Sequence, residues 1–248
     1  MEKLFIIIPA RLNSTRLPNK VLKRINGKTL VQHIWEKLII FPNVLIATDS
    51  KKIVNEARKF NAKVILTNEN HINGTERCNE VVKKINLCKD DIIINVQCDE
   101  LNISTDWIKN IYNELLKTDE EIISTISTSL GVQKKQFWED YRKDPSNVQV
   151  LMDENNFATN FKRATKKLVL NNNIKIDHHI GIYGYKTKTL QKVAKLKATH
   201  REKLEKLEQL RWLENNFKIK CLRTKDVHFG FSINTKEDLE RLKKQNIL

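Results

Sequence analysis

The chain carries a cluster of polar and cationic side chains directly after its first apolar segment. Residues 4–8 are apolar and mostly β-branched, which is typical of a strand buried on both faces of a parallel sheet. Pro9 is expected to end this strand. The loop beyond it contains Arg11, Ser14, Arg16 and Lys20. Ligands of open α/β sheets bind beyond the carboxyl ends of the strands, so these side chains predict a polyphosphate site; the alternative is a solvated basic loop.

This loop matches neither of the common glycine-rich phosphate loops. A Walker loop needs glycines and a Lys-Ser/Thr pair, and the dinucleotide fingerprint needs closely spaced glycines at the start of a helix. Neither pattern occurs, and the chain has only 6 glycines. Side chains must therefore contact most of the anion, with guanidinium groups binding phosphate oxygens in pairs and lysine acting as a movable point charge.

A second group of polar residues follows the apolar segment 92–94. It reads Asn95-Val96-Gln97-Cys98-Asp99-Glu100 and places two carboxylates at the carboxyl end of a predicted strand. Mg²⁺ prefers oxygen ligands and commonly takes one or two carboxylates together with substrate phosphates and water. Asp99 is therefore the candidate metal ligand. The alternative is that Asp99 and Glu100 cap a turn or the following helix.

The elements that must position these groups alternate between strand and helix. Predicted strands cover residues 4–8, 44–48, 63–66, 91–96, 122–128, 148–152 and 180–185, and helical periodicity covers 28–41, 105–117 and 201–216. Short links between them are typical of a parallel sheet covered by helices. The expected fold is α/β, with a mostly parallel twisted sheet and flanking helices. Polar segments 131–145 and 166–177 are the candidates for flexible or subunit-contacting regions.

Length and composition favour one compact enzyme. A chain of 248 residues can bury a substantial core within a single α/β domain. No apolar run approaches the roughly 20 residues of a membrane span, and no signal peptide precedes the first strand, so we expect a cytoplasmic protein without membrane insertion. The cysteines are Cys78, Cys88, Cys98 and Cys221. Their spacing indicates neither a zinc site nor a disulfide framework, so we expect free thiols.

The charge of the chain raises a competing hypothesis. A formal net charge of +15 and a pI near 9.6 are compatible with a nucleic-acid binder. The lysine pairs, however, are spread along the whole sequence and are not concentrated in one segment with interleaved aromatic residues. We therefore expect no specific nucleic-acid partner, although a positive field would help attract anionic substrates.

Taken together, the motifs resemble the 3-deoxy-manno-octulosonate cytidylyltransferase (CMP-Kdo synthetase) family nearly end to end. The segments that carry the resemblance are Pro9-Ala10-Arg11, Ser14-Thr15-Arg16-Leu17-Pro18 with Lys20, Gly74-Thr75-Glu76-Arg77, Asn95-Val96-Gln97, Asp99-Glu100, His179, Gly181-Ile182-Tyr183-Gly184-Tyr185 and Leu207-Glu208-Gln209-Leu210-Arg211. The resemblance implies a Rossmann-like nucleotidyltransferase fold. It also implies one domain over residues 1–248, with a dimerisation and sugar-binding region within about 130–190, and a homodimer.

The same resemblance implies a reaction and a role for each matched residue. The anomeric hydroxyl of Kdo, or of a close analogue such as 8-amino-Kdo, attacks the α-phosphate of CTP for lipopolysaccharide synthesis, and pyrophosphate leaves. Arg16 and Lys20 stabilise phosphate charge, and Asp99 binds Mg²⁺. The nucleotide contacts are Ala10, Arg11, Ser14 and Arg77, and the acidic sugar is bound by Gln97, Arg163, His179, Tyr183, Glu208 and Gln209.

The chain departs from the family pattern at three positions. Cys98 replaces a glycine and Leu101 a proline, and a thiol at position 98 is expected to narrow the sugar pocket or alter the local backbone. Asn234 replaces the second metal-binding aspartate, so it offers Mg²⁺ a neutral oxygen in place of a carboxylate. These departures motivate an alternative, a weakened or non-catalytic homologue that binds nucleotide and sugar.

Overall fold

The computed structural model describes residues 3–13, 17–130, 135–164, 175–225, 233, 237–238 and 240. Its strands are β1 (Leu4–Ala10), β2 (Arg24–Ile25), β3 (Lys28–Thr29), β4 (Val44–Thr48), β5 (Lys63–Leu66), β6 (Ile92–Val96), β7 (Ile123–Ser129), β8 (Val148–Met152), β9 (Ala158–Arg163), β10 (Lys175–Lys186) and β11 (Ile219–Thr224). Its helices are α1 (Leu30–Leu38), α2 (Lys51–Arg58), α3 (Gly74–Lys84), α4 (Thr105–Leu116), α5 (Lys135–Lys143), α6 (Thr187–Val193), α7 (His200–Glu205) and α8 (Gln209–Glu214), with a 3-10 turn, η1 (Lys20–Leu22).

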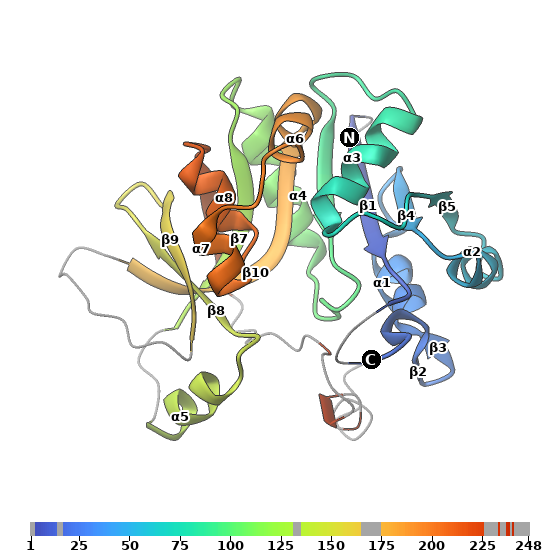
Figure 1. Ribbon diagram of the computed structural model, residues 1–248, viewed down its shortest axis with the longest axis horizontal. Helices are drawn as coiled ribbons and strands as arrows, with labels where there is room; N and C mark the ends of the chain where they lie inside the picture. The colour runs from blue at the N-terminus through green and yellow to red at the C-terminus, as the bar shows by residue number, and fades with distance from the viewer. Residues whose placement is uncertain are drawn as a thin grey trace.

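A mixed but mostly parallel sheet forms the centre of the molecule (Figure 1). Its strand order is β11-β7-β10-β6-β1-β4-β5. The pairs β1–β4, β1–β6, β4–β5 and β7–β11 are parallel, whereas β10 runs antiparallel to both β6 and β7. The antiparallel strands β8 and β9 extend the sheet from the first residues of β10, at the end away from β4 and β5. The predicted fold class is confirmed.

Apolar residues of the strands pack on both faces of the sheet. Along β1, Leu4, Ile6 and Ile8 face one core together with α1, α2 and α4, while Ile7 faces the second core with α3, α6 and α8. This alternation follows from the two-residue period of a strand. The two cores make three layers, helix, sheet and helix, which explains why the central strands are apolar at nearly every position.

The strand β1 does not end at Pro9 as expected but continues through it to Ala10. The amide of Ile6 donates to Asn43 on the β4 side, so the nitrogen of Pro9, three residues on, points toward β6. Pairing of β1 with β6 stops at Ile7, whereas pairing with β4 reaches Ala10. The Pro9 nitrogen therefore faces a side on which β1 is no longer paired, so no hydrogen bond is lost by the missing amide proton and proline fits the strand.

The helix predicted over 201–216 is wrong. The chain forms two short helices, α7 and α8, separated at Lys206, whose φ of 54° is left-handed. The strands β9 and β11 were not predicted, and α5 lies within the polar segment 131–145. The strand predicted at 180–185 is the second half of the longer β10, and the other predicted strands and helices are found with small shifts at their ends.

Two further findings bear on the composition. All four cysteines are free thiols, and Cys78, Cys98 and Cys221 are buried. Within the part of the chain that the structure describes, none of the helices has the length and apolarity that crossing a bilayer requires.

Candidate active site

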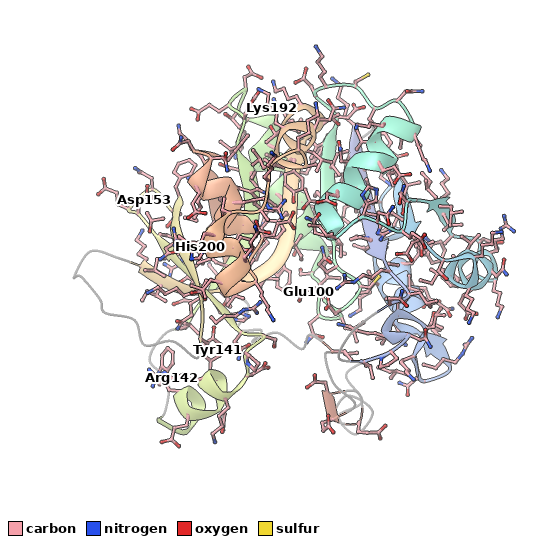
Figure 2. The ribbon with its side chains drawn as sticks, in the orientation of Figure 1. Glu100, Tyr141, Arg142, Asp153, Lys192 and His200 are labelled. Atoms are coloured by element: carbon pink, nitrogen blue, oxygen red, sulfur yellow. The ribbon has the colours of Figure 1, made fainter. Side chains whose placement is uncertain are left out.

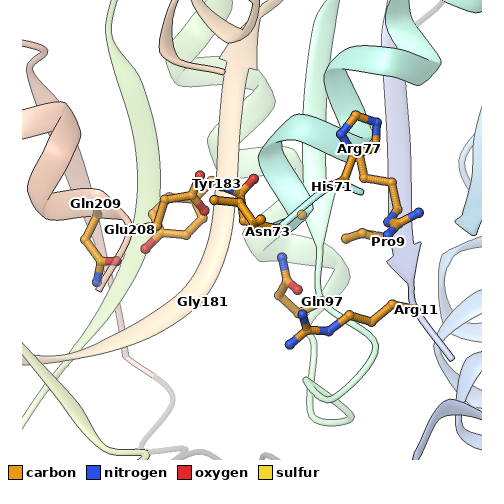
Figure 3. A pocket seen from close by; sticks show the side chains of 12 residues that line it. Pro9, Arg11, His71, Asn73, Arg77, Gln97, Gly181, Tyr183, Glu208 and Gln209 are labelled. Carbon is orange, nitrogen blue, oxygen red and sulfur yellow. The ribbon is translucent and has the colours of Figure 1, made fainter. Parts of the chain in front are cut away.

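A cavity of about 330 Å³ lies beyond the carboxyl ends of β1 and β6 (Figure 3). Its lining residues come from β1, the start of α3, the end of β6, the middle of β10 and the start of α8: Pro9, Arg11, His71, Ile72, Asn73, Gly74, Arg77, Gln97, Gly181, Tyr183, Glu208 and Gln209. The position agrees with the rule that α/β sheets bind ligands at this edge. The cavity brings residues of the predicted nucleotide set and the predicted sugar set together.

The loop after β1 reaches the cavity through Arg11, an exposed residue on its wall. Ala10, the last residue of β1, is fully buried. Ser14 and Arg16 lie outside the described residues. Lys20 begins the turn η1 directly after Asn19, a residue with a left-handed φ of 54°, and this turn directs the lysine inward.

The Lys20 ammonium contacts the Asp99 carboxylate at 2.6 Å between Nζ and Oδ2. Their side chains are 11% and 29% exposed, so the contact is shielded but open on the carboxylate side. Asp99 follows Gln97, which lines the cavity, by two residues. The contact joins the loop after β1 to the end of β6, the two segments predicted to hold phosphate and metal.

Glu100 lies beside this pair, near the centre of the structure and away from α5 (Figure 2). Burial, followed by the neighbouring charge of Asp99, raises the pKa of Glu100 to about 7, against the opposing effects of Lys20 and the amide of Gly181. The backbone amide of Gly181, a cavity residue, donates to the Glu100 carboxylate. Glu100 is held by the Gly181 amide, so Asp99, whose side chain is 29% exposed, is the carboxylate of this segment that is open to a cation.

The residues present fit a single-carboxylate magnesium site. Asp99 does not line the cavity itself, but it follows the cavity residue Gln97 by two positions and offers a partly exposed hard oxygen ligand. Mg²⁺ commonly completes its shell with substrate phosphates and water. Within the described ranges, no group of three or more His, Cys, Asp or Glu side chains could hold a metal without such help. Asn234, the other predicted ligand, lies outside the described residues.

Arg77 lines the cavity, but its guanidinium group is braced by protein atoms. It contacts Asp49 at 2.8 Å, donates to the Thr67 hydroxyl at 2.5 Å and to the Asn68 carbonyl at 3.3 Å, and is only 2% exposed. Asp49 in turn accepts from the backbone amide of Leu12. Arg77 thus connects the loops after β4 and β5 to the loop after β1.

The opposite wall is formed by Tyr183, Glu208 and Gln209, which Figure 3 shows across the cavity from Arg11. The Tyr183 ring packs edge-on against Trp212 with centroids 4.9 Å apart, which fixes its place on β10. Burial raises the pKa of Glu208 to about 7, and the nearby charges of Glu202 and Glu76 act in the same direction, whereas Arg211 opposes them. The Arg211 guanidinium is held by Glu202 at 2.5 Å.

Two members of the predicted sugar set lie behind this wall. His179 is 6% exposed, packs between Phe161 and Tyr183, and has its Nε2 3.0 Å from the Thr125 hydroxyl. Burial lowers the pKa of His179 to about 3. Arg163 donates to backbone carbonyls of Pro145, Glu205 and Lys206. Their sugar-binding roles stay predictions, and in this structure both side chains support the wall.

Cys98, one basis for expecting a narrowed sugar pocket, is 5% exposed and packs in the core with α1 and α4. Leu101 is fully buried in the same core. The expectation that the thiol narrows the pocket is therefore wrong, because successive residues after β6 point to opposite faces and the cavity lies on the other one. Burial raises the pKa of the Cys98 thiol far above its usual range.

The sequence analysis missed the wall made by the loop before α3. Asn73 caps this helix by accepting from the Glu76 amide at 2.8 Å, and His71 contacts Glu80 at 2.5 Å. Ile72 lies on the cavity wall and is 64% exposed. The pairing of Asn73 with Glu76 three residues later is a capping signal in the sequence and would have located this turn.

Comparison with known proteins agrees with this site. The cytidylyltransferase family matches residues 5–219. The chain is 39% identical to a 3-deoxy-manno-octulosonate cytidylyltransferase of Francisella tularensis subsp. holarctica over 98% of both chains. It is 38% identical to the protein of that name from Fusobacterium nucleatum, over 95% of this chain and 94% of the other.

Solved structures give the same result. The fold matches that of CMP:2-keto-3-deoxy-manno-octonic acid synthetase complexed with CTP, with a TM-score of 0.84, 28% identity and 98% of each chain covered. A cytidylyltransferase from Leptospira borgpetersenii, 20% identical with a TM-score of 0.64 over 99% of this chain and 88% of the other, shares the fold. As the motifs predicted, this chain belongs to the cytidylyltransferase family, among the 3-deoxy-manno-octulosonate cytidylyltransferases.

Proposed function

We propose that this protein transfers the cytidylyl group of CTP to the anomeric hydroxyl of a 3-deoxy-ulosonic acid, either Kdo or an analogue such as 8-amino-Kdo. A bond forms between the hydroxyl oxygen and the α-phosphorus, the bond from that phosphorus to the β-phosphate oxygen breaks, and the hydroxyl proton passes to solvent. The observation that carries the proposal is the cavity whose walls combine Arg11 and Arg77 with Tyr183, Glu208 and Gln209.

In-line transfer of this kind is promoted by positioning and by neutralising charge on the phosphates. Arg11 is exposed on the cavity wall, which suits contact with a triphosphate. Lys20 stabilises charge on the transferred group, and its contact with Asp99 holds the ammonium near the site before the nucleotide arrives. Ser14 and Arg16 are proposed to contribute to nucleotide binding and charge stabilisation from the same loop.

The proposed cofactor is Mg²⁺, held by Asp99 with substrate oxygens and water, and by the amide oxygen of Asn234. When bound, the ion supplies Lewis acidity at the α-phosphate and lowers the pKa of the attacking hydroxyl. The residues of the chain then orient the two substrates on the two walls. The proposed sugar wall offers the Tyr183 hydroxyl, the Glu208 carboxyl and the Gln209 amide as partners for hydroxyl groups.

We further propose a cytoplasmic homodimer that acts in lipopolysaccharide synthesis, with its subunit contact within about 130–190 and one nucleotidyltransferase domain per chain. The extension of the sheet by β8 and β9, away from the parallel strands, supports this choice of region (Figure 1). Sedimentation velocity over a concentration series tests it, and a species that stays monomeric at micromolar concentration contradicts the dimer.

Pyrophosphate release with CTP, Mg²⁺ and a panel of ulosonic acids tests the proposed activity. We expect turnover with Kdo or 8-amino-Kdo and none with UTP in place of CTP. Nucleotide binding without turnover on any sugar would instead support the non-catalytic homologue, which the burial of Cys98 away from the cavity does not favour. Asn234→Asp should raise the rate at limiting Mg²⁺ if metal loading limits this chain.

A further inference from the structure

Asn95 and Gln97 project from the end of β6 toward the same helix. Ile92, Ile94 and Val96 pack in the core with α1 and α4, whereas Ile93 packs in the core with α3. Alternate residues of a strand share a face, so Asn95 and Gln97 both lie on the α3 side. Gln97 reaches the cavity, and Asn95 lies one step deeper in the sheet.

Asn95 is a polar residue in an otherwise apolar buried strand. It is 1% exposed, and its strand is paired on both sides, with Ile7 on β1 and Tyr183 on β10. Its Oδ1 accepts a hydrogen bond from Nε2 of Gln97 at 2.9 Å. A buried amide is costly unless it is hydrogen-bonded, so this contact offsets the burial of Asn95 and at the same time restrains the Gln97 amide.

Gly74 packs against the same amide and also lies close to the Asn95 side chain. A Cβ atom at this position would lie 2.8 Å from Nε2 of Gln97 and 3.1 Å from Cγ of Pro9. Real Cβ atoms do not approach other atoms to 2.8 Å, so any other residue would push Gln97 away. The glycine at the first residue of α3 therefore leaves room for the Gln97 amide where it lies, and a larger residue would require the Gln97 side chain to move.

We propose that Asn95 and Gly74 are positioning residues that fix the Gln97 amide with its nitrogen toward the sheet and its carbonyl oxygen toward the cavity. Gln97 then acts as a hydrogen-bond acceptor, and the substrate group that meets it is a donor, a sugar hydroxyl or the cytosine amine. The inference rests on the proposed function, because the donor is a group of one of its two substrates.

Removing the acceptor on Asn95 tests the proposal. Asn95→Leu keeps the branched shape of the side chain, although leucine is larger, and it frees the Gln97 amide to turn its nitrogen into the cavity. If the donor is a sugar hydroxyl, KM for the ulosonic acid should rise about fivefold to tenfold while CTP affinity, measured by calorimetry, is unchanged. If the donor is the cytosine amine, CTP affinity falls instead and the KM for the sugar is unchanged. Unchanged values of both overturn the proposal.

A double-mutant cycle separates positioning from a merely structural role. Asn95→Leu added to Gln97→Leu should cause no further loss of substrate affinity, because Asn95 acts through Gln97. Additive losses would overturn the proposal. Asn43→Leu is the matched control, since the Asn43 amide donates to the Leu4 carbonyl at 3.0 Å at the other end of the sheet. It should lower the thermal unfolding midpoint without changing either substrate constant.

Gly74→Ala gives an independent test if Asn95→Leu fails to fold. It should change the same substrate constant as Asn95→Leu and should lower the thermal unfolding midpoint. Adding Gln97→Ala to Gly74→Ala should restore part of that midpoint, because it removes the clashing atoms. No recovery overturns the proposed clash. If the wild-type protein turns over its substrates and the variants keep the wild-type substrate constants, this inference alone is refuted. If the wild-type protein is inactive on every ulosonic acid, the proposed function is refuted.

Discussion

The Lys20 ammonium lies 2.6 Å from the Asp99 carboxylate, although the two residues are separated by 79 positions in the chain. Parallel pairing of β1 with β6 brings the segments that follow both strands to the same edge of the sheet. The pair holds a cation next to an anion at that edge of the sheet, and neither residue is among those that line the cavity of about 330 Å³. A triphosphate bound with a divalent ion would bring the opposite partner to each of them, so substrate binding can replace the contact without leaving either charge unpaired.

Replacing Lys20 tests its part in charge stabilisation. We expect Lys20→Met to lower kcat/KM for CTP by about 100-fold, because one fixed cation near the transferring phosphate is lost. Steady-state pyrophosphate release measures the change. Lys28→Met is the control, since Lys28 pairs with Glu36 on the surface and is 47% exposed. Equal activity of the two variants would contradict the assignment.

Replacing Asp99 tests the metal site. Asp99→Asn keeps an oxygen at the same place but removes its charge, so the Mg²⁺ concentration for half-maximal rate should rise by at least about tenfold. The measurement is a magnesium titration at saturating substrates. Asp106→Asn is the control, because Asp106 is an exposed acidic residue of α4. A magnesium dependence that does not change on Asp99→Asn argues against this ligand.

The buried pair of Arg77 and Asp49 predicts a loss of stability. Their side chains are 3% and 14% exposed, so Arg77→Met leaves a shielded carboxylate without its partner. We expect the free energy of unfolding in urea to fall by about 3 kcal/mol. Lys109→Met, which breaks the exposed pair with Asp106, should cost less than about 1 kcal/mol. If Arg77→Met lowered the free energy of unfolding by as little as Lys109→Met, the Arg77 pair would contribute little to stability.

Much of this site could be predicted from single strands and their following loops. The apolar segments before Arg11 and Asp99 identify buried parallel strands, and the edge where such strands end is fixed by their direction. Direct contact between Lys20 and Asp99 could not be predicted, because it depends on the turn that begins after Asn19 with its left-handed backbone.

The parts that could not be predicted depend on contacts distant in sequence. β9 alternates apolar and polar residues only weakly, and it becomes a strand by pairing with β8. β11 is completed by β7, almost 100 residues earlier in the chain. The leucine periodicity of 201–216 is continuous across Lys206, but the two carbonyls bound by Arg163 stabilise a turn there that periodicity does not reveal.

The raised pKa of Glu208 predicts a pH dependence of stability. On folding, this pKa rises from 4.5 to about 7, so the folded protein keeps a proton that the unfolded chain releases within this window. The contribution of Glu208 is therefore fully present below pH 4.5 and is lost as the pH rises through about 7. Glu208→Gln removes this loss, and its stability relative to wild type should increase by up to about 1.4 kcal/mol per pH unit across the window.

Urea unfolding of both proteins at pH 4, 6 and 8 measures this difference. Glu205→Gln, three residues earlier in the chain, is the control. A constant difference between Glu208→Gln and wild type at all three values would contradict the raised pKa.

The left-handed turn at Lys206 predicts that glycine stabilises this position. Lys206 has a φ of 54° and ψ of 46°, and its amide donates to the Glu202 carbonyl at 2.7 Å as the C-terminal cap of α7. A side chain is strained in this conformation, whereas glycine adopts it freely. Lys206→Gly should raise the free energy of unfolding by about 1 kcal/mol. The carbonyl that accepts from Arg163 belongs to the backbone and is kept.

Urea unfolding compares this variant with two others. Lys203→Gly places glycine inside α7, where φ is helical, and should cost about 1 kcal/mol. Lys206→Val should lower the free energy of unfolding by more than a valine substitution does at a turn residue with negative φ. The reason is that a β-branched residue is the least compatible with positive φ. If Lys206→Gly were less stable than wild type, the lysine side chain would have to contribute more than its backbone strain costs, and the break between α7 and α8 would need another cause.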